Sequence, residues 1–158
     1  PNYFEILDRL NKNLELDFIK NVFKYEKVLI GGCFDCLHAG HIHLFSEAIR
    51  LAKTLIIAIN SDNSVSKLKG KSRPFQDIET RISNIKKLGI SSNIVVFDEN
   101  SPVKVLEETR PDVFLKGGDY DGDEDFDDFN YCKKNNIDLH FATTKEGFSS
   151  TRIIDEIK

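Results

Sequence analysis

Residues 28–41 read VLIGGCFDCLHAGH, and this stretch decides how the rest of the chain is interpreted. An apolar run ends in Gly31 and Gly32, and the next predicted helix opens a few residues later with His38-Ala-Gly-His41. Glycine at the end of a strand lets backbone N–H groups come close to a ligand. The free N–H groups and the dipole of a helix N-terminus attract anions. The stretch therefore predicts a phosphate site at a strand-to-helix turn.

His38 and His41 lie three residues apart, so their side chains share one face of the predicted first helical turn. Two imidazole donors beside free backbone N–H groups suit the oxygens of a phosphate chain. A single histidine at this place would be interpreted as a structural cap. Two histidines around a glycine, directly after a glycine-ended strand, favour ligand binding instead.

The two cysteines of the same stretch leave other interpretations open. Cys33 and Cys36 are spaced like a redox pair, and together with His38 and His41 they could bind zinc. A thioredoxin-like pair opens a helix directly, whereas Leu37 and His38 intervene here. All zinc ligands would come from one short stretch, without the second cluster that common zinc spacings supply. The redox pair and the zinc site are therefore the less favoured interpretations.

Five short apolar runs alternate with helical patterns along the chain and predict the fold class. The run with LIIAI at 55–59 is apolar throughout, which is typical of a strand covered on both faces. The alternation predicts an α/β fold, a Rossmann-like doubly wound parallel sheet of five strands, with ligands beyond the carboxyl ends of the strands. The predicted strands are Val28–Gly31, Leu55–Asn60, Ile94–Phe97, Val113–Lys116 and Ile137–Phe141.

Helices are predicted where apolar residues recur at helical spacing between these runs. Residues 42–52 and 78–88 form two such patterns, and Gly89 follows the second as a stop. Ser101 and Pro102 predict the start of a further helix, with serine as the cap and proline at the first helical position.

The acidic segment 119–129, DYDGDEDFDDF, does not fit the pattern of a calcium loop. Its glycine falls at the fourth position and Asn130 at the twelfth, whereas such loops need glycine at the sixth and glutamate at the twelfth. The segment therefore predicts a solvated loop that runs into a helix, with Phe126 and Phe129 facing the core.

The bulk composition excludes several classes of function. The formal net charge of −4 argues against a nucleic-acid partner. No apolar run approaches membrane-spanning length and no signal-peptide pattern is present, so no membrane partner is expected. Three cysteines without framework spacing favour a reducing, cytoplasmic setting.

The 158 residues are expected to form one domain with a short extension. Apolar residues before the first predicted strand, such as Phe4, Leu7 and Phe18, predict two short helices packed on the outside. The expected organisation is an N-terminal helical extension at 1–26 and the main domain at 27–158.

Four segments carry a resemblance to a known enzyme family. HAGH at 38–41 fits the H-x-G-H pattern of the nucleotidyltransferase superfamily, and GCFDCLHAGH resembles its cytidylyltransferase-like branch. NSDNSVSKLKGKSRP at 60–74, RPDVFLKGGDY at 110–120 and EGFSSTRIIDEI at 146–157 are similar to the adenylyltransferases that make ADP-heptose from D-glycero-D-manno-heptose 1-phosphate. The resemblance covers the domain at 27–158, with the motifs in family order.

The resemblance implies a group transfer without a covalent enzyme intermediate. A phosphate oxygen of a sugar phosphate attacks the α-phosphate of a nucleoside triphosphate, and pyrophosphate leaves. The protein then contributes positioning and charge stabilisation. His38 and His41 are implied to hold the triphosphate, and Lys69 and Lys71, on the predicted loop SKLKGKSR, to form a cationic lid over it.

Other binding residues follow from the strand ends and from family position. Lys116 and Gly117 end the fourth predicted strand as glycines end the first, which favours close approach of a nucleotide. Asn60, Asp62 and Arg73 are implied to bind the acceptor substrate. The further nucleotide-binding residues that the resemblance implies are Gly32, Cys33, Phe34, Asp35, Gly40, Arg81, Asp119, Ser149, Ser150 and Thr151.

The resemblance implies Mg²⁺ as cofactor, and Asp35 and Asp119 could hold it or bind a hydroxyl of the nucleotide or sugar. ATP is favoured because Thr144 and Lys145 stand where cytidylyltransferases typically carry Arg-Thr. The alternative is a CTP-dependent cytidylyltransferase for glycerol 3-phosphate or another polyol phosphate. A homodimer is expected, because relatives are often dimers. The remaining alternative is a nucleotide sensor, which would bind nucleotide without catalysing a reaction.

Overall fold

The computed structural model describes residues 2, 4–6, 23–91, 93–118 and 120–143. Most of the helical extension predicted at 1–26 lies outside the described residues. So do Asp119 and the predicted phosphate-binding hydroxyl residues Ser149, Ser150 and Thr151. The account that follows concerns the described residues.

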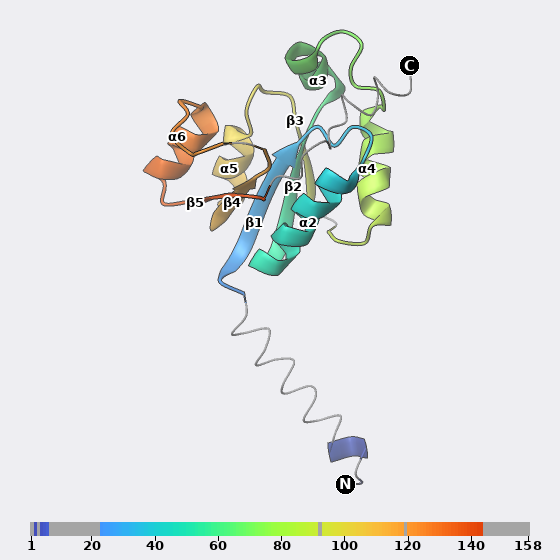
Figure 1. The fold of residues 1–158 in the computed structure, drawn as a ribbon, viewed down its shortest axis with the longest axis vertical. Coiled ribbons are helices and arrows are strands. Elements are labelled where there is room, and N and C mark those ends of the chain that lie inside the picture. Colours follow the sequence, from blue (N-terminus) through green and yellow to red (C-terminus); the bar gives the residue numbers. More distant parts are fainter. Residues whose placement is uncertain (1, 3, 7–22, 92, 119, 144–158) are drawn as a thin grey trace.

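Five parallel strands form one sheet in the order β3-β2-β1-β4-β5 (Figure 1). The chain starts in the middle, moves outward through β2 and β3, and then adds β4 and β5 on the other side of β1. This order confirms the predicted doubly wound sheet, and its direction reverses between β1 and β4. The strands are β1 (Tyr25–Gly32), β2 (Ala52–Asn60), β3 (Ile94–Phe97), β4 (Val113–Lys116) and β5 (Asp138–Phe141).

The first two strands begin earlier than their apolar runs. The β1–β2 ladder already pairs Tyr25 with Ala52 and Lys27 with Thr54. Glu26 and Lys53, which lie between these pairs at the amino edge of the sheet, are exposed to water and form an ion pair. Polar residues fit such positions, so the apolar run marks only the buried part of each strand.

Helices cover both faces of the sheet, with α2 and α4 on one face and α5 and α6 on the other (Figure 1). In β1, Val28 and Ile30 belong to the core on the α2 side, and Leu29 to the core with α5 and α6. All three side chains are fully buried, which explains the uninterrupted apolar run. No described helix is long and apolar enough to cross a membrane. The helices are α2 (Ala39–Leu51), α3 (Asp62–Lys69), α4 (Ile78–Lys87), α5 (Val103–Thr109) and α6 (Asp127–Lys134).

Helix α3 was not predicted. The sequence analysis expected SKLKGKSR at 66–73 to be a loop, but its first four residues belong to α3, which covers Asp62–Lys69. Its N-cap is Ser61, whose Oγ accepts the backbone N–H of Ser64 at 3.1 Å. Val65 is the one fully buried apolar residue of the helix. A single buried apolar residue in a polar segment leaves no helical periodicity to detect.

Two details at helix starts differ from the prediction. Ser101 does not cap α5, because the N-cap is Pro102 and no side chain caps this helix. Phe129 is fully buried as predicted, whereas Phe126, the N-cap of α6, is 43% exposed, so its predicted core position is wrong. Gly89, with φ of 67°, follows α4 as the predicted stop.

Candidate functional site

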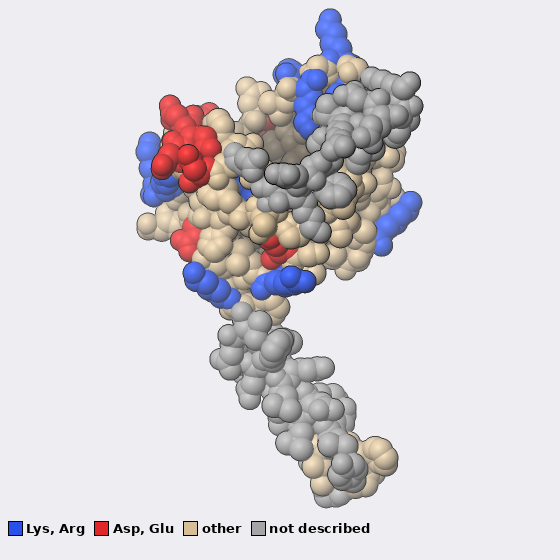
Figure 2. All heavy atoms as spheres, in the orientation of Figure 1, with Lys and Arg blue, Asp and Glu red and all other residues tan. Residues whose placement is uncertain are grey.

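A cavity of about 940 Å³ opens at the carboxyl ends of the strands. Its walls come from the ends of β1 and β4, the start of α2, the end of α3 and the segment before α6. Figure 2 shows the molecule hollowed on this side, next to α6. Doubly wound sheets bind ligands at this edge. The predicted site residues that line the cavity are Gly32, Cys33, Phe34, His38, Gly40, His41, Asn60, Lys69, Lys116 and Gly117.

The two histidines stack on each other, with ring centroids 3.8 Å apart. Nδ1 of His38 accepts the backbone N–H of Gly40 at 3.0 Å, and Nδ1 of His41 accepts the backbone N–H of His38 at 3.3 Å. Because Nδ1 accepts in both rings, the proton of each neutral imidazole is assigned to Nε2. The histidines therefore cap the start of α2 and still keep one N–H donor each for a ligand.

Both histidines are neutral at physiological pH. Burial lowers the pKa of His41 to about 3, with help from His38 and from the charge of Lys69. Burial and the charge of Lys69 also lower the pKa of His38. Neutral imidazoles donate hydrogen bonds to phosphate oxygens but carry no charge. Positive charge in the cavity must therefore come from lysine side chains.

Lys69, the last residue of α3, and Lys116, the last residue of β4, both line the cavity. The Nζ atom of Lys116 lies 5.7 Å from the ring centroid of Tyr120, a cation–π contact. Lys71 lies in the turn after α3, is exposed, and does not line the cavity. The structure thus brings Lys69 to the histidines and leaves Lys71 outside.

Asp35 is fully buried and does not line the cavity. Its carboxylate accepts Arg73 Nε at 2.9 Å and the backbone N–H groups of Phe75 and Gln76 at 2.7 and 2.9 Å. Burial raises the pKa of Asp35, but these hydrogen bonds outweigh it and hold the pKa below its ordinary value. The carboxylate is engaged with protein groups on both oxygens, so it anchors the chain around residues 73–76.

The turn between β1 and α2 contains backbone strain. Phe34 and Cys36 have φ of 51° and 55°, the left-handed region that non-glycine residues rarely adopt. Strand β1 ends at Gly32, one residue beyond its predicted end at Gly31, so Cys33 and Phe34 belong to the turn. The backbone N–H of Cys36 donates to Gln76 Oε1 at 3.2 Å. Contacts from the chain around Gln76 therefore hold the turn in its strained shape.

Arg81 is fully buried and does not line the cavity, although the resemblance implied nucleotide binding. Its Nη1 donates to the carbonyls of Cys33 at 2.8 Å and Asn60 at 2.7 Å. Its Nε donates to the carbonyl of Gln76 at 3.0 Å, and its Nη2 pairs with Asp62 Oδ1 at 2.6 Å. The guanidinium joins the ends of β1 and β2 to the start of α3.

Of the three residues predicted to bind the acceptor, one lines the cavity. Asn60 lines it, and its Nδ2 donates to Ser64 Oγ at 2.9 Å. Asp62 is paired with Arg81, and Arg73 is buried against Asp35. These ion pairs direct Asp62 and Arg73 toward the protein.

Within the residues that the structure describes, no group of three or more His, Cys, Asp or Glu side chains is placed to hold a metal ion. Asp35 does not fit as a direct Mg²⁺ ligand, because its two oxygens already accept three N–H donors. The thiols of Cys33 and Cys36 are free, and burial raises the pKa of both. A raised thiol pKa opposes the thiolate that redox exchange requires.

Several cavity residues were missed by the sequence analysis. Some of them lie in the loop between β3 and α5. Ligands bind beyond the carboxyl ends of the strands, so the end of β3 could have indicated these residues. The acidic segment before α6 also reaches the cavity, although its composition indicated a solvated loop. The missed residues include His43, Asn100, Ser101, Pro102, Tyr120, Asp125, Phe126, Asp127 and Asp128.

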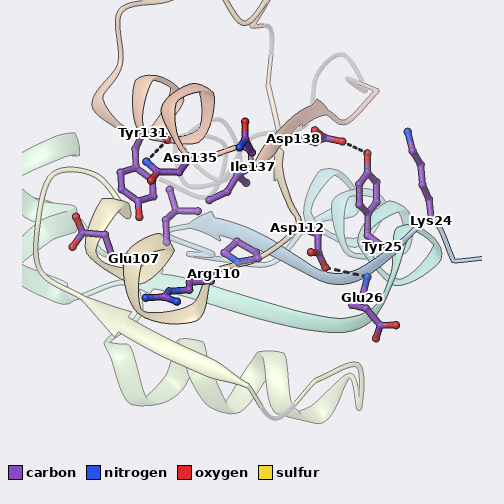
Figure 3. Close-up of a pocket in the computed structure, with 13 residues that line it drawn as sticks. Lys24, Tyr25, Glu26, Glu107, Arg110, Asp112, Tyr131, Asn135, Ile137 and Asp138 are labelled. Carbon is purple, nitrogen blue, oxygen red and sulfur yellow. Dashed lines mark hydrogen bonds between the residues drawn. The ribbon is translucent and has the colours of Figure 1, made fainter.

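A second cavity, of about 870 Å³, lies at the opposite edge of the sheet (Figure 3). It is lined by residues at the amino ends of β1 and β5 and by Arg110 and Asp112 before β4. Tyr25 Oη donates to Asp138 Oδ2 at 2.6 Å on its wall. None of the predicted site residues lies here, and doubly wound sheets bind ligands at the other edge. The first cavity is therefore the candidate active site.

A parallel doubly wound sheet with a glycine-ended central strand and a His-x-Gly-His helix start defines a nucleotidyltransferase type of α/β protein. The comparison with protein families agrees with this class. The cytidylyltransferase-like family model matches residues 29–156, and the chain belongs to this family.

Two curated relatives show which proteins within the family this chain is similar to. The chain is 37% identical over 136 residues to the bifunctional protein HldE of Coxiella burnetii, covering 82% of this chain and 27% of that protein. It is 39% identical over 131 residues to HldE of Photorhabdus laumondii, covering 83% of this chain and 27% of that protein. The chain thus spans about a quarter of the length of these curated relatives.

Solved structures support the fold. A lipopolysaccharide core biosynthesis protein of Thermoplasma volcanium superposes with a TM-score of 0.62 at 26% identity, covering 77% of this chain and 99% of that one. A bifunctional NMN adenylyltransferase/ADP ribose pyrophosphatase of Francisella tularensis superposes with a TM-score of 0.52 at 15% identity, covering 84% and 41%. The second likeness concerns the fold alone.

Proposed function

We propose that this domain transfers an adenylyl group from ATP to D-glycero-D-manno-heptose 1-phosphate and releases pyrophosphate. The observation that carries the proposal is the pair His38 and His41, which present Nε2–H donors at a cavity that also contains Lys69 and Lys116. Similarity to the bifunctional HldE proteins and to a lipopolysaccharide core biosynthesis protein supports a sugar phosphate as acceptor.

The reaction divides into positioning and charge stabilisation. A phosphate oxygen of the acceptor forms a bond to the α-phosphorus of ATP while the bond to the β-phosphate oxygen breaks, and the electron pair leaves with pyrophosphate. The Nε2–H groups of His38 and His41 donate to phosphate oxygens whose charge grows during transfer, and Lys69 and Lys116 supply the opposing charge. Neutral rings can take this role, because Nε2 carries a proton to donate while Nδ1 accepts a backbone N–H.

The nucleotide is the finer part of the proposal. ATP is preferred to CTP because Thr144 and Lys145 replace the Arg-Thr of typical cytidylyltransferases. The CTP-dependent reaction with glycerol 3-phosphate or another polyol phosphate is the alternative. Mg²⁺ remains part of the proposal as the partner of the triphosphate, since Mg²⁺ usually reaches such sites bound to phosphates with few protein ligands.

The test is pyrophosphate release in the presence of Mg²⁺, with ATP or CTP against heptose 1-phosphate or glycerol 3-phosphate. Release with ATP and heptose 1-phosphate alone supports the proposal. Release with CTP moves the protein to the cytidylyltransferase reaction. Nucleotide binding without release from any of the four pairs would favour the sensor interpretation.

Three accompanying expectations have their own tests. Stoichiometric zinc in the purified protein, or a reversible Cys33–Cys36 disulfide, would favour the metal or redox interpretation. A homodimer is tested by light scattering in solution. A cytoplasmic location, which suits a nucleoside triphosphate substrate and free thiols, is tested by fractionating cells.

A further inference from the structure

The candidate active-site cavity has two halves of different charge. Lys69, Lys116 and the two histidine donors come from the ends of α3 and β4 and the start of α2, and this set is called the cationic half. Asp125, Asp127 and Asp128 come from the segment before α6 and its first turn, and this set is called the α6 half. Figure 2 shows acidic side chains gathered over α6 beside the hollow. Phosphate groups are repelled by carboxylates, so the α6 half suits a part of the substrate that carries hydrogen-bond donors and no negative charge.

Asp128 differs from its acidic neighbours because it is buried, with 4% of its surface exposed. Its Oδ1 accepts the backbone N–H of Phe129 at 3.1 Å. Among the described residues, Oδ2 has no hydrogen-bond partner and the carboxylate has no ion pair. The second oxygen of this carboxylate is therefore available to accept a hydrogen bond from a donor in the cavity. Since Asp128 lines the cavity, a ligand can supply that donor.

Aromatic rings line the same cavity as this carboxylate. Tyr120 and Phe126 both line the cavity and pack edge to face, with ring centroids 5.8 Å apart. Tyr120 also packs against the buried ring of Phe129, at 5.7 Å. Phe126 is 43% exposed, which leaves its ring available to a ligand. Flat aromatic groups pack well against such rings, whereas a polyhydroxylated sugar gains less from them.

The same wall connects the two halves. Lys116, in the cationic half, lies over the Tyr120 ring. A ligand with phosphates at one end and a flat, donor-bearing ring at the other therefore matches the cavity along its length. A nucleoside triphosphate with an amino group on its base has this form.

We propose that Asp128 determines base specificity by accepting a hydrogen bond from the exocyclic amino group of a nucleobase packed against Tyr120 and Phe126. The inference rests on the proposed nucleotidyltransferase function but not on the choice between ATP and CTP, since adenine and cytosine both carry an exocyclic amino group. Inosine and uracil carry an oxygen at the same place. That oxygen would face the Asp128 carboxylate acceptor to acceptor, which a site built around a buried polar group rejects strongly.

The experiment compares paired nucleotides that differ at this one group. Catalytic efficiency, kcat/KM for pyrophosphate release, is measured for ATP against ITP and for CTP against UTP. The wild-type protein should prefer the amino base. Asp128→Asn can donate as well as accept, so it should reduce the preference about tenfold or more, the size expected for a hydrogen bond to a charged group. Asp123→Asn, an exposed change in the same segment outside the cavity, should leave the preference unchanged.

The ratio of kcat/KM for the amino base to that for the oxo base distinguishes recognition of the base by Asp128 from a purely structural role of Asp128. If Asp128 only stabilises the start of α6, Asp128→Asn lowers both efficiencies equally, and an unchanged ratio overturns the proposal. Asp128→Ser, which suits the first helical turn, replaces Asp128→Asn if the latter fails to fold. If wild-type protein releases no pyrophosphate, the proposed function fails separately. The dissociation constants of ATP and ITP then decide, and equal constants or no binding overturn the inference.

Discussion

The guanidinium of Arg81 joins the carboxyl ends of two strands, with Nη1 2.8 Å from the Cys33 carbonyl and 2.7 Å from the Asn60 carbonyl. Cys33 leads into the glycine–histidine turn, and Asn60 leads into α3, which ends in the cavity lysine Lys69. One buried side chain therefore sets the separation between the histidine side and the lysine side of the cavity.

Replacing this guanidinium should weaken the whole fold. Arg81→Met leaves buried carbonyls without donors, so we expect it to lower the free energy of unfolding by about 2–4 kcal/mol, measured by urea titration. The matched control is Arg110→Met, because Arg110 is exposed, and its change should stay within about 0.5 kcal/mol. A stable Arg81→Met protein with only a raised KM for nucleotide would instead support the nucleotide-binding role implied by resemblance.

Loss of a histidine donor should remove most turnover. We expect His41→Ala to lower kcat by ~10²–10³, the usual size for one positioned donor to developing charge. Pyrophosphate release measures it, and circular dichroism confirms folding. His140→Ala is the control, since His140 contacts Tyr25 outside the candidate cavity and should keep turnover. Near wild-type turnover in folded His41→Ala would contradict the phosphate-site interpretation.

The same histidine should make stability depend on pH. The pKa of His41 is about 3 in the folded protein and near its ordinary 6.5 when unfolded, so only the unfolded chain binds a proton between these values. The contribution of His41 to the free energy of unfolding should be fully present above pH 6.5 and should decrease as the pH falls toward 3. Urea titrations at pH 7.5 and 5 should show a smaller loss for His41→Gln than for wild type. Equal losses would mean that His41 does not bury a neutral ring.

The resemblance implies that Lys69 and Lys71 form one lid, but substituting them should have different effects on activity. Lys69 lines the cavity and lowers the pKa of both histidines, whereas Lys71 is exposed outside it. We expect Lys69→Met to lower kcat/KM about tenfold or more, and Lys71→Met to change it less than about threefold. Steady-state kinetics with each variant measure this. Equal losses would show that the turn with Lys71 reaches the triphosphate once substrate binds.

A methyl group at Gly118 should disturb the aromatic wall. Gly118 has φ of 108°, and a Cβ there would stand 2.9 Å from Tyr120 Cε2. Gly89 also has a positive φ, of 67°, but its Cβ would meet no atom within 4 Å. We expect both alanine variants to lose about 1 kcal/mol of stability to backbone strain, and Gly118→Ala to lose more and to raise the KM for nucleotide. Matching losses with unchanged KM in both would contradict a role for the Tyr120 ring.

Prediction from the sequence worked where local patterns carry the information. The strand positions, the helices α2 and α4, and the glycine–histidine turn all follow from apolar runs, spacing and capping residues that lie close together in the chain. Helix α3 was missed because only Val65 is buried in it. Phe126 was predicted to lie in the core because it is a large apolar residue, whereas its position as the N-cap of α6 leaves it partly exposed.

The sequence by itself determined the doubly wound sheet and the edge at which its candidate site lies, since buried parallel strands and glycine-ended turns leave local signatures. The tertiary structure decided which charged residues face that edge. Asp35 and Arg81 turn inward because their hydrogen-bond partners, including Arg73 and Asn60, come from distant parts of the chain. Asp128 reaches the cavity because α6 packs against β5 beside it. Which polar group is satisfied by protein and which is left for a ligand depends on these long-range contacts, and no local pattern in the sequence records them.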